Sequence, residues 1–326
     1  MKSLMFAWVG YQRRADVMRD YWAYELVHLP KVLKSKFLLP LDYVVRLFLT
    51  LKNLHAEKPS VVWLQLPPSF ILHFVLLYRF LSFRDFRVVV DGHNSLFRAK
   101  WIKFPLAKWC LSKADLVLVH NADVYAEAVS IGLSKDNLFV LEDCPFELSS
   151  ASPHRQSRPF IIFPCSFDVD EPIDKVVDAA RLLPDVDFYV SGRYEGKISP
   201  TLLQALPDNV KLTGYMPKVE FEALLCGADA VLGLTTRDSV QLSVANEGIS
   251  AGRPLVLSNT RTLRSLYGEC AVFVDNESSQ SMAAGLQEAI SQTAKFESLS
   301  KELSESRHQR WLQQAGLLRE RVSQKK

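Results

Sequence analysis

Short apolar runs alternate with longer amphipathic stretches along almost the whole of this 326-residue chain. Runs such as Val61–Leu66 and Arg87–Asp91 are rich in β-branched residues, which predicts buried strands. The stretches between them carry apolar residues at helical spacing. Such an alternation predicts βαβ units, in which helices pack on a mostly parallel sheet. The pattern therefore predicts an α/β fold.

The pattern occurs twice, and each half has its own set of expected elements. In the first half we expect strands at Leu4–Val9, Val61–Leu66, Arg87–Asp91, Leu116–His120 and Leu138–Leu141, and helices at Arg13–Leu26, Leu41–His55, Ser69–Leu81, Phe104–Ser112 and Ala122–Ile131. In the second half we expect strands at Phe160–Phe163, Asp187–Ser191, Val210–Thr213, Ala230–Leu234, Pro254–Ser258 and Ala271–Val274. The helices expected there are Pro172–Leu183, Pro200–Leu206, Val219–Cys226, Val244–Ser250, Ser279–Gln292 and a long final helix over Glu297–Val322.

A polar segment separates the two halves. Glu147–Pro159 is rich in Ser and Pro and lacks apolar periodicity, which is typical of a linker. We therefore expect an N-terminal Rossmann-like domain over residues 1–150 and a C-terminal one over residues 159–296. The helix over residues 297–326 is expected to form a separate C-terminal segment. The predicted architecture is two doubly wound domains that face each other across a cleft.

Composition fits a globular protein, with 48% hydrophobic and 23% charged residues. Its five cysteines are scattered without a C-x-x-C pair, which favours reduced thiols and an intracellular protein. The most apolar window, Phe70–Phe83, contains His73 and Arg79 and is shorter than the ~20 residues that span a bilayer. We therefore expect a cytoplasmic protein without a membrane-spanning helix.

Charge is distributed unevenly along the chain. Residues 1–113 carry 18 lysines and arginines against 7 acids, whereas the whole chain has a net charge of only +3. The first part therefore has a net charge of +11 and the remainder −8. Such a split predicts that the first part meets an anionic partner.

The second half contains the most specific motif. Residues 247–258, "EGISAGRPLVLS", resemble the Glu-Ala-x-Ala-x-Gly-x-Pro-hydrophobic signature of nucleotide-sugar glycosyltransferases with the GT-B fold, the group 1 type or glycosyltransferase family 4. Residues 208–236 and 271–290 resemble that family's neighbouring blocks in the same order. In the first half, "RVVVDGHNSLF" at 87–97 and "VGYQRRAD" at 9–16 are more loosely similar. The resemblance implies sugar transfer from a nucleotide-diphospho-sugar, with retention of configuration and without a metal. It also implies that the helix over residues 297–326 packs back on the first domain.

The resemblance also implies a donor site in the second half. Glu247 matches the carboxylate that binds the ribose hydroxyls in this family, and a carboxylate can accept two hydrogen bonds from a vicinal diol. The bland alternative is an acid that merely favours the first turn of a helix. The further donor-binding candidates are Arg237, Asp238, Ser239, Gln241, Arg193 and Tyr215.

Two departures from the family's pattern concern this donor site. Ser239 stands where the family carries a second glutamate eight residues before the first. Acids in "FPCSFDVDEP", residues 163–172, stand where the family has Arg and Lys against the diphosphate. These departures leave open a protein that has kept the fold and lost the chemistry.

His93 is the catalytic candidate, because it follows a strand and matches a histidine that lies near the transferred sugar in this family. A neutral imidazole can donate to a sugar hydroxyl or share a proton with an acceptor. The loop of Gly10, Tyr11, Gln12 and Arg13 is implied to face the donor phosphates or the acceptor. A hydrogen-bonded loop histidine and an ordinary βα turn are the alternatives.

Two Asp-x-Asp matches, Asp168–Asp170 and Asp185–Asp187, raise the question of a metal. The tripeptide is short and arises easily by chance, so we expect no metal site and no cofactor beyond the nucleotide-sugar substrate.

Residues 97–113, "FRAKWIKFPLAKWCLSK", interleave basic and aromatic side chains. This mixture is typical of surfaces that lie on anionic lipid headgroups. The predicted membrane contacts are Lys100, Trp101, Lys103, Lys108 and Trp109, and Lys31–Pro40 is a second candidate segment. The alternative is an amphipathic helix whose aromatic face packs on the sheet. No nucleic-acid-binding motif accompanies the patch, so we expect no nucleic-acid partner.

Two hypotheses of different classes follow. The first is a GT-B glycosyltransferase that transfers a sugar to a lipid-linked glycan acceptor at the inner face of a membrane. The second is a non-catalytic GT-B-like protein that binds a partner or a membrane.

Overall fold

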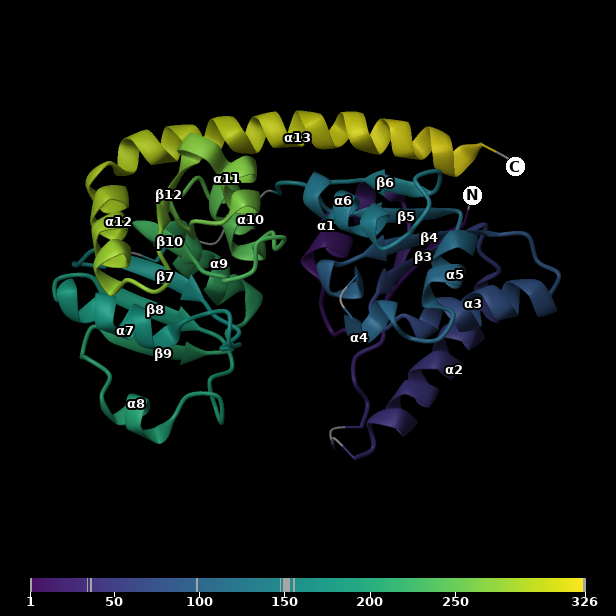
Figure 1. Cartoon of the computed structure of the whole chain (residues 1–326), viewed down its shortest axis with the longest axis horizontal. Coiled ribbons are helices and arrows are strands. Elements are labelled where there is room, and N and C mark those ends of the chain that lie inside the picture. The colour runs from purple at the N-terminus through teal and green to yellow at the C-terminus, as the bar shows by residue number, and fades with distance from the viewer. Residues whose placement is uncertain are drawn as a thin grey trace. The chain divides into compact units, whose positions relative to one another are not determined.

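The structure is a computed structural model that describes residues 2–33, 35, 37–97, 99–146, 148, 153–154 and 156–324. It contains two compact units. Unit 1 comprises Met1–Cys144 and Arg310–Lys326, and unit 2 comprises Pro145–Gln309. Much of the expected linker Glu147–Pro159 lies outside the described residues. Most helices and strands of both units are labelled in Figure 1.

Unit 1 is built on a six-stranded sheet of order β2-β1-β3-β4-β5-β6. Every pairing in it is parallel. The strands are β1 Ser3–Ala7, β2 Glu25–His28, β3 Val61–Leu66, β4 Arg87–Gly92, β5 Leu116–Val119 and β6 Leu138–Val140. The helices are α1 Arg13–Trp22, α2 Leu39–Glu57, α3 Phe70–Leu81, α4 Ala99–Ile102, α5 Ala107–Lys113 and α6 Ala122–Ser130, with a 3₁₀ turn η1 at Asn94–Phe97.

Unit 2 repeats this plan with the order β12-β11-β10-β7-β8-β9, again with parallel pairings. Its strands are β7 Phe160–Pro164, β8 Asp187–Ser191, β9 Val210–Gly214, β10 Ala230–Gly233, β11 Leu255–Ser258 and β12 Ala271–Val274. Its helices are α7 Ile173–Leu182, α8 Pro200–Gln204, α9 Lys218–Gly227, α10 Ser243–Ser250, α11 Arg261–Tyr267 and α12 Ser279–Ser291, with a 3₁₀ turn η2 at Gly268–Cys270. The expectation of an α/β fold with parallel sheets is confirmed.

Two expected helices were wrong in their extent, and some elements were missed. The helix expected over Arg13–Leu26 ends at Trp22, because Ala23 adopts a left-handed conformation with φ of 48° and the chain then enters β2. The helix expected over Phe104–Ser112 begins only at Ala107, after Leu106 with φ of 59°. Strand β2 and helix α11 were not expected from the sequence.

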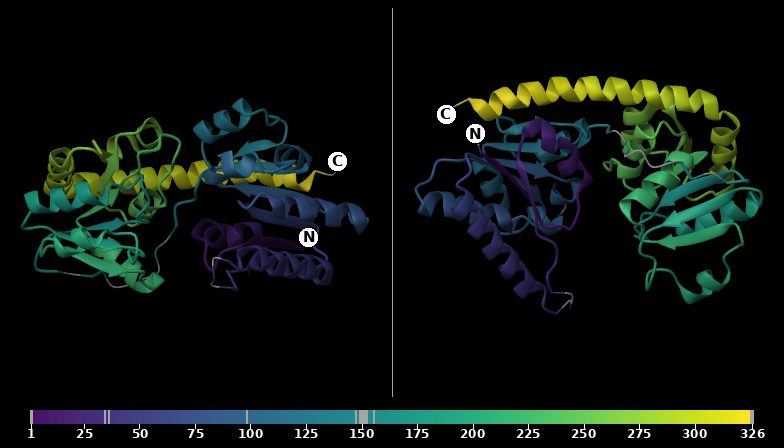
Figure 2. Two further views of the ribbon diagram at one scale, coloured as in Figure 1. Left: turned by 60° about the horizontal axis from the view of Figure 1, so that its bottom comes forward. Right: turned by 180° about the vertical axis from the view of Figure 1, so that it is seen from behind.

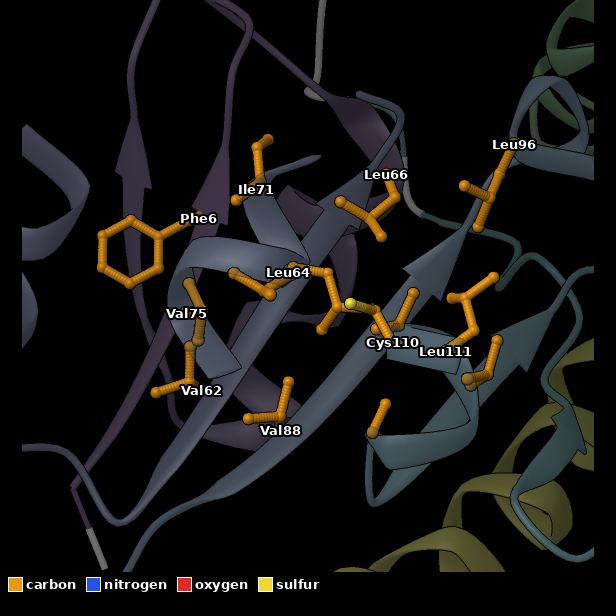
Figure 3. Packing of buried hydrophobic residues seen from close by; sticks show 14 of the residues in the cluster. Phe6, Val62, Leu64, Leu66, Ile71, Val75, Val88, Leu96, Cys110 and Leu111 are labelled. Atoms are coloured by element: carbon orange, nitrogen blue, oxygen red, sulfur yellow. The ribbon is translucent and has the colours of Figure 1, made fainter. Parts of the chain in front are cut away.

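Both faces of each sheet are buried, as parallel sheets require. Alternate residues of β1 and β3 enter different cores: Phe6, Val62 and Leu64 pack on one face of the unit 1 sheet, and Met5 and Trp63 on the other. Figure 3 shows the first of these cores, where Phe6, Val62 and Leu64 lie with α3 residues such as Val75. The long apolar runs of the sequence are therefore strands covered on both faces.

The last helix, α13 at Thr293–Ser323, is divided between the two units, and its course is visible from two further sides in Figure 2. Residues Trp311, Ala315, Leu318 and Val322 are buried in the second core of unit 1. Their spacing of four, three and four residues places them on one helix face. Among the described residues, no helix is both long and apolar enough to cross a membrane.

Candidate functional site

The carboxyl edge of the unit 1 sheet gathers polar side chains from three strand ends. Gln12 follows β1 and caps α1, Asp91 and His93 lie at the end of β4, and His120 follows β5. Because parallel strands end at the same edge, residues far apart in sequence meet there. The first loop and the histidine that the sequence singled out are thus brought together.

His93 sits beside a buried carboxylate. Its Nε2 lies 3.6 Å from Asp91 Oδ2, and His120 Nε2 lies 3.4 Å from Asp91 Oδ1. The two imidazole rings are 4.7 Å apart and nearly perpendicular. Gln12 Oε1 accepts from the backbone N–H of Ala15, which leaves its amide nitrogen 3.3 Å from His93 Nε2. His93 keeps 25% of its side chain exposed, whereas Asp91 and His120 are buried, so His93 is the member that a ligand can reach.

Arg14 provides the positive charge of this cluster. Its Nε donates to Asp91 Oδ1 at 3.1 Å, and its Nη1 donates to Asp143 Oδ1 at 2.6 Å. The same guanidinium also donates to the backbone oxygens of Leu141 and Glu142, each at 2.8 Å. Arg14 is therefore a buried donor of four hydrogen bonds that joins α1, β4 and the segment after β6.

The charges of the cluster follow from these contacts. Burial alone would raise the pKa of Asp91, but the charge of Arg14 and the hydrogen bonds of His120 and His93 outweigh it and hold the pKa well below its usual range. Burial and the nearby Arg14 lower the pKa of His120. At neutral pH the carboxylate is therefore ionised and His120 is a neutral imidazole.

Asp91, His93 and His120 place potential ligand atoms within 4.8 Å of one another. Two imidazoles and a carboxylate can bind a transition metal. Arg14, however, already lies 3.1 Å from the carboxylate and would repel a cation there. The same imidazoles and carboxylate can also accept or donate protons and bind hydroxyl groups.

In unit 2, Glu247 lies half-buried in α10, one turn after the helix begins at Ser243. The bland alternative, in which Glu247 merely favours the first turn of a helix, is therefore not supported. A Cβ on Gly248 would come within 2.4 Å of Leu255 Cδ2, so glycine allows the close approach of α10 to β11. Gly252, with φ of 62°, ends the helix: its N–H donates to Ile249 O, and the next N–H, of Arg253, donates to Gly248 O.

The loop after β10 is held by an acid that the sequence analysis treated as a departure. Asp170 accepts from Thr235 Oγ1 at 2.9 Å and pairs with Arg237 Nη2 at 3.1 Å. Its backbone oxygen accepts from Thr236 N–H. Asp170 thus fixes Arg237 at the carboxyl edges of β7 and β10, while 42% of the Arg237 side chain stays exposed.

The remaining donor-site candidates differ in accessibility. Asp238 accepts from the backbone N–H of Arg261 at 2.7 Å, so it also serves the start of α11. Ser239 is half-buried and Gln241 is buried, and both make contacts inside the protein. Arg193 is exposed after β8, and its guanidinium lies 4.9 Å from the centre of the exposed Tyr215 ring after β9.

Gly192, next to Arg193, allows the chain after β8 to approach the chain after β7 closely. A Cβ on Gly192 would come within 1.9 Å of Cys165 O, and Gly192 has a φ of 139°. The N–H of Cys165 donates to Ser191 O, and that of Gly192 donates to Gly214 O. Arg193 therefore lies at the same edge as the loop that carries Asp170.

The predicted membrane contacts are only partly exposed. Lys100, Lys103, Lys108 and Trp109 are exposed, although Lys108 Nζ donates to Ile131 O. Trp101 is half-buried and packs against the unit 1 core. Gly10 and Tyr11 are exposed, and Arg13 lies over the Tyr11 ring. Arg98, in the same basic segment, lies outside the described residues.

The sequence analysis missed Arg14, His120 and the anchoring role of Asp170. Arg14 and Asp91 are 77 residues apart, so only the pairing of β1 and β4 with β3 brings them together. His120 had a weak signal, since it follows the apolar run of β5 just as His93 follows that of β4.

No protein-family model and no curated protein matches this sequence. Solved structures do match it over its full length. HepE of Anabaena in complex with UDP-glucose has a TM-score of 0.75 at 14% identity and covers 99% of both chains. Sucrose-phosphate synthase from Thermosynechococcus elongatus has a TM-score of 0.71 at 15% identity and covers 98% of both chains. The lipopolysaccharide outer core galactosyltransferase WaaB has a TM-score of 0.64 at 13% identity and covers 98% of this chain and 100% of that one. The chain therefore has the two-domain α/β fold of the GT-B glycosyltransferases.

Proposed function

We propose that the protein is a glycosyltransferase that moves a sugar from a nucleotide-diphospho-sugar to a lipid-linked glycan acceptor. One observation carries this proposal: the fold matches, over 99% of both chains, that of a protein solved with UDP-glucose. The site residues add support, because both sheets carry accessible polar groups at their carboxyl edges, where ligands of such sheets bind.

The donor is proposed to bind unit 2. Glu247 accepts hydrogen bonds from the ribose hydroxyls, and the exposed part of Arg237 neutralises the diphosphate. The ion pair with Asp170 orients Arg237 without enclosing it, since 42% of its side chain remains exposed. Arg193 and Tyr215 form a second accessible basic group at this edge. Arg237 and Arg193 would thus replace the basic phosphate ligands that residues 163–172 lack.

His93 is proposed to contact the transferred sugar or the acceptor. The ionised Asp91 stabilises the imidazolium that forms when His93 takes a proton, and Gln12 holds the ring. In the retaining, metal-independent reaction, the positive charges of Arg237 and Arg193 stabilise the leaving diphosphate. Acceptor chemistry is assigned to unit 1, whose basic surface matches a lipid-linked, anionic acceptor.

A thermal-shift panel of UDP-, GDP- and ADP-sugars tests the donor half of the proposal. Stabilisation by one of them, followed by release of the nucleoside diphosphate on addition of an acceptor, supports it. The His93→Gln variant is expected to retain donor binding and lose turnover. Unchanged turnover of the variant instead would remove His93 from the reaction.

The second candidate is a non-catalytic GT-B-like protein that binds a partner or a membrane. Ser239 in place of the family's second glutamate favours it. Under this alternative no nucleotide-sugar stabilises the protein, and the same panel decides between the two.

A further inference from the structure

Helix α2 has its polar and apolar faces reversed with respect to the protein interior. Asp42, Arg46 and Thr50, at a spacing of four residues, are buried in unit 1. Their polar groups are used there: Asp42 pairs with Arg46 and accepts from Val32 N–H at 2.7 Å. Arg46 donates to Trp8 O, and Thr50 accepts from Trp8 Nε1. The buried side of α2 is thus a polar seam that contains an ion pair and is joined by hydrogen bonds to the rest of unit 1.

The outward side of α2 is apolar. Leu41, Val44 and Phe48 follow one another at helical spacing, and Phe48 is 65% exposed. A helix on a water-facing surface normally shows the opposite arrangement. Turning the helix over would break the hydrogen bonds of these side chains with Trp8 and with the backbone of residues 32–33. The packing of the polar residues of α2 therefore keeps the apolar stripe on the surface of unit 1.

Helix α3 extends the stripe. It touches α2 through Tyr43 and Phe70, whose rings are 5.0 Å apart. Its own outward side chains are Phe74, Leu77 and Phe80, and Phe80 is 74% exposed. We call the outward residues of α2 and α3 the apolar face; both helices are labelled on unit 1 in Figure 1. Large exposed apolar surfaces of this kind mark interaction sites.

Charge indicates what covers the apolar face. Residues 31–113 carry 14 lysines and arginines against four acids. Two of the four acids, Asp42 and Asp91, are paired with arginines inside unit 1. These two acids therefore do not neutralise exposed lysines such as Lys52 and Lys103, which can contact an anionic partner. A second copy of this chain would bring the same positive charge to the contact, whereas an anionic bilayer surface complements it.

We infer that the apolar face of α2 and α3 inserts into the headgroup region of an anionic lipid bilayer. The two helices lie in the interface with their apolar side chains toward the acyl chains, and the lysines contact the headgroups. This inference deepens the proposed function, because it names the surface on which a lipid-linked acceptor is reached. It moves the main contact from residues 97–113, where Trp101 packs inward, to α2 and α3.

Flotation of the full chain with vesicles tests this inference. Vesicles of phosphatidylcholine, with and without phosphatidylglycerol, are mixed with the wild type, with a V44E/F48E variant and with an L77E/F80E variant. A V219E/L203E variant is the matched control, because it changes exposed apolar residues of unit 2 by the same charge. A neutral V44S/F48S variant separates loss of apolar contact from added charge.

We expect the wild type and the control to float with the anionic vesicles only. Each variant of the apolar face, including V44S/F48S, should lower the vesicle partition coefficient about tenfold. Equal flotation of the face variants and the control would overturn the inference. So would a wild type that does not float and instead forms a dimer that F48E dissociates. Nucleotide-sugar binding, measured on the same variants by thermal shift, should not change. If the protein binds a nucleotide-sugar but does not float, only the inferred membrane contact of the apolar face is refuted. If it floats but binds no nucleotide-sugar, only the proposed glycosyltransferase function is refuted.

Discussion

Arg14 Nε donates to Asp91 Oδ1 at 3.1 Å, and both side chains are buried. This pair neutralises the charge of a carboxylate that lies 3.6 Å from His93. It also connects the candidate catalytic histidine to the C-terminal helix. Arg14 binds the backbone oxygen of Glu142, whose side chain pairs with Arg310 and accepts from Gln314 of α13.

Removing Arg14 should destabilise unit 1 strongly. Arg14→Met leaves Asp91 buried without its counter-charge, which typically costs about 3–5 kcal/mol. Denaturant unfolding followed by circular dichroism measures the change. A double variant, R14M with D91N, should recover part of the loss because the unpaired charge is gone. If Arg14→Met unfolds at the same denaturant concentration as the wild type, the Arg14–Asp91 pair does not contribute to the free energy of unfolding.

The sequence predicted the local elements well where an apolar run or a helical period was long. β3, β8 and β12 coincide with their predicted ranges, because buried parallel strands have continuous apolar runs. β2 escaped prediction because Glu25–His28 is a short edge strand with little burial, and its apolar residues also continue the period of α1. Local pattern alone cannot separate these two cases.

The site was predictable to a smaller extent. His93 and the loop of Gln12 were found because they follow strands, and the structure places them 3.3 Å apart. Arg14 was not found, since a lone arginine in a helix has no local signal, and His120 was overlooked although it follows β5 just as His93 follows β4. Asp170 was interpreted as a sign that the phosphate-binding residues are missing. Its role could not be predicted, because its partner Arg237 follows β10, which is distant in the sequence.

Stability should fall as the pH drops through the range in which His120 titrates in the unfolded chain. The folded-state pKa of His120 is lowered below its ordinary value of 6.5, so the unfolded state binds more protons below about pH 7. The free energy of unfolding should therefore decrease with falling pH, by at most ~1.4 kcal/mol per pH unit for one proton. His120→Asn should flatten this slope, and His55→Asn, at an exposed position on α2, should not. A slope unchanged by His120→Asn would assign the pH dependence to other groups.

Protonation of Asp91 should also lower the free energy of unfolding as the pH falls, but at lower pH than protonation of His120. The folded-state pKa of Asp91 is held well below the usual value, so its contribution is complete above about pH 4 and is lost as the pH falls through the folded-state pKa. Asp91→Asn should reduce the further loss of stability seen in acid unfolding. Identical acid-unfolding midpoints for the variant and the wild type would contradict the assigned pKa direction.

Gly248 and Gly316 offer a matched test of helix packing. Gly248→Ala places a Cβ within 2.4 Å of Leu255 Cδ2, and we expect a loss of about 1–3 kcal/mol in the free energy of unfolding. Gly316→Ala, in α13, meets no atom within 4 Å and should gain up to about 1 kcal/mol from helix propensity. Thermal unfolding of both variants gives the comparison. Similar effects of the two substitutions would show that α10 does not approach β11 as closely as described.

Asp170 should matter for donor binding although it need not touch the donor. Asp170→Asn removes the charge that orients Arg237, and we expect donor affinity to fall by about tenfold, with a smaller effect on stability. Arg237→Ala alone should weaken binding more, and adding Asp170→Asn to it should have little further effect. Independent, additive losses in the double variant would contradict the anchoring role.

The most direct test of the central claim is calorimetric titration of the wild type, Glu247→Gln and Glu220→Gln with nucleotide-sugars, beginning with UDP-glucose. Glu220 is an exposed acid of α9 and serves as the control. The account predicts saturable binding of one nucleotide-sugar to the wild type and to Glu220→Gln, and a loss of about 1–3 kcal/mol in binding free energy for Glu247→Gln. Equal affinity of all three proteins, or no binding of any nucleotide-sugar to the wild type, would contradict it.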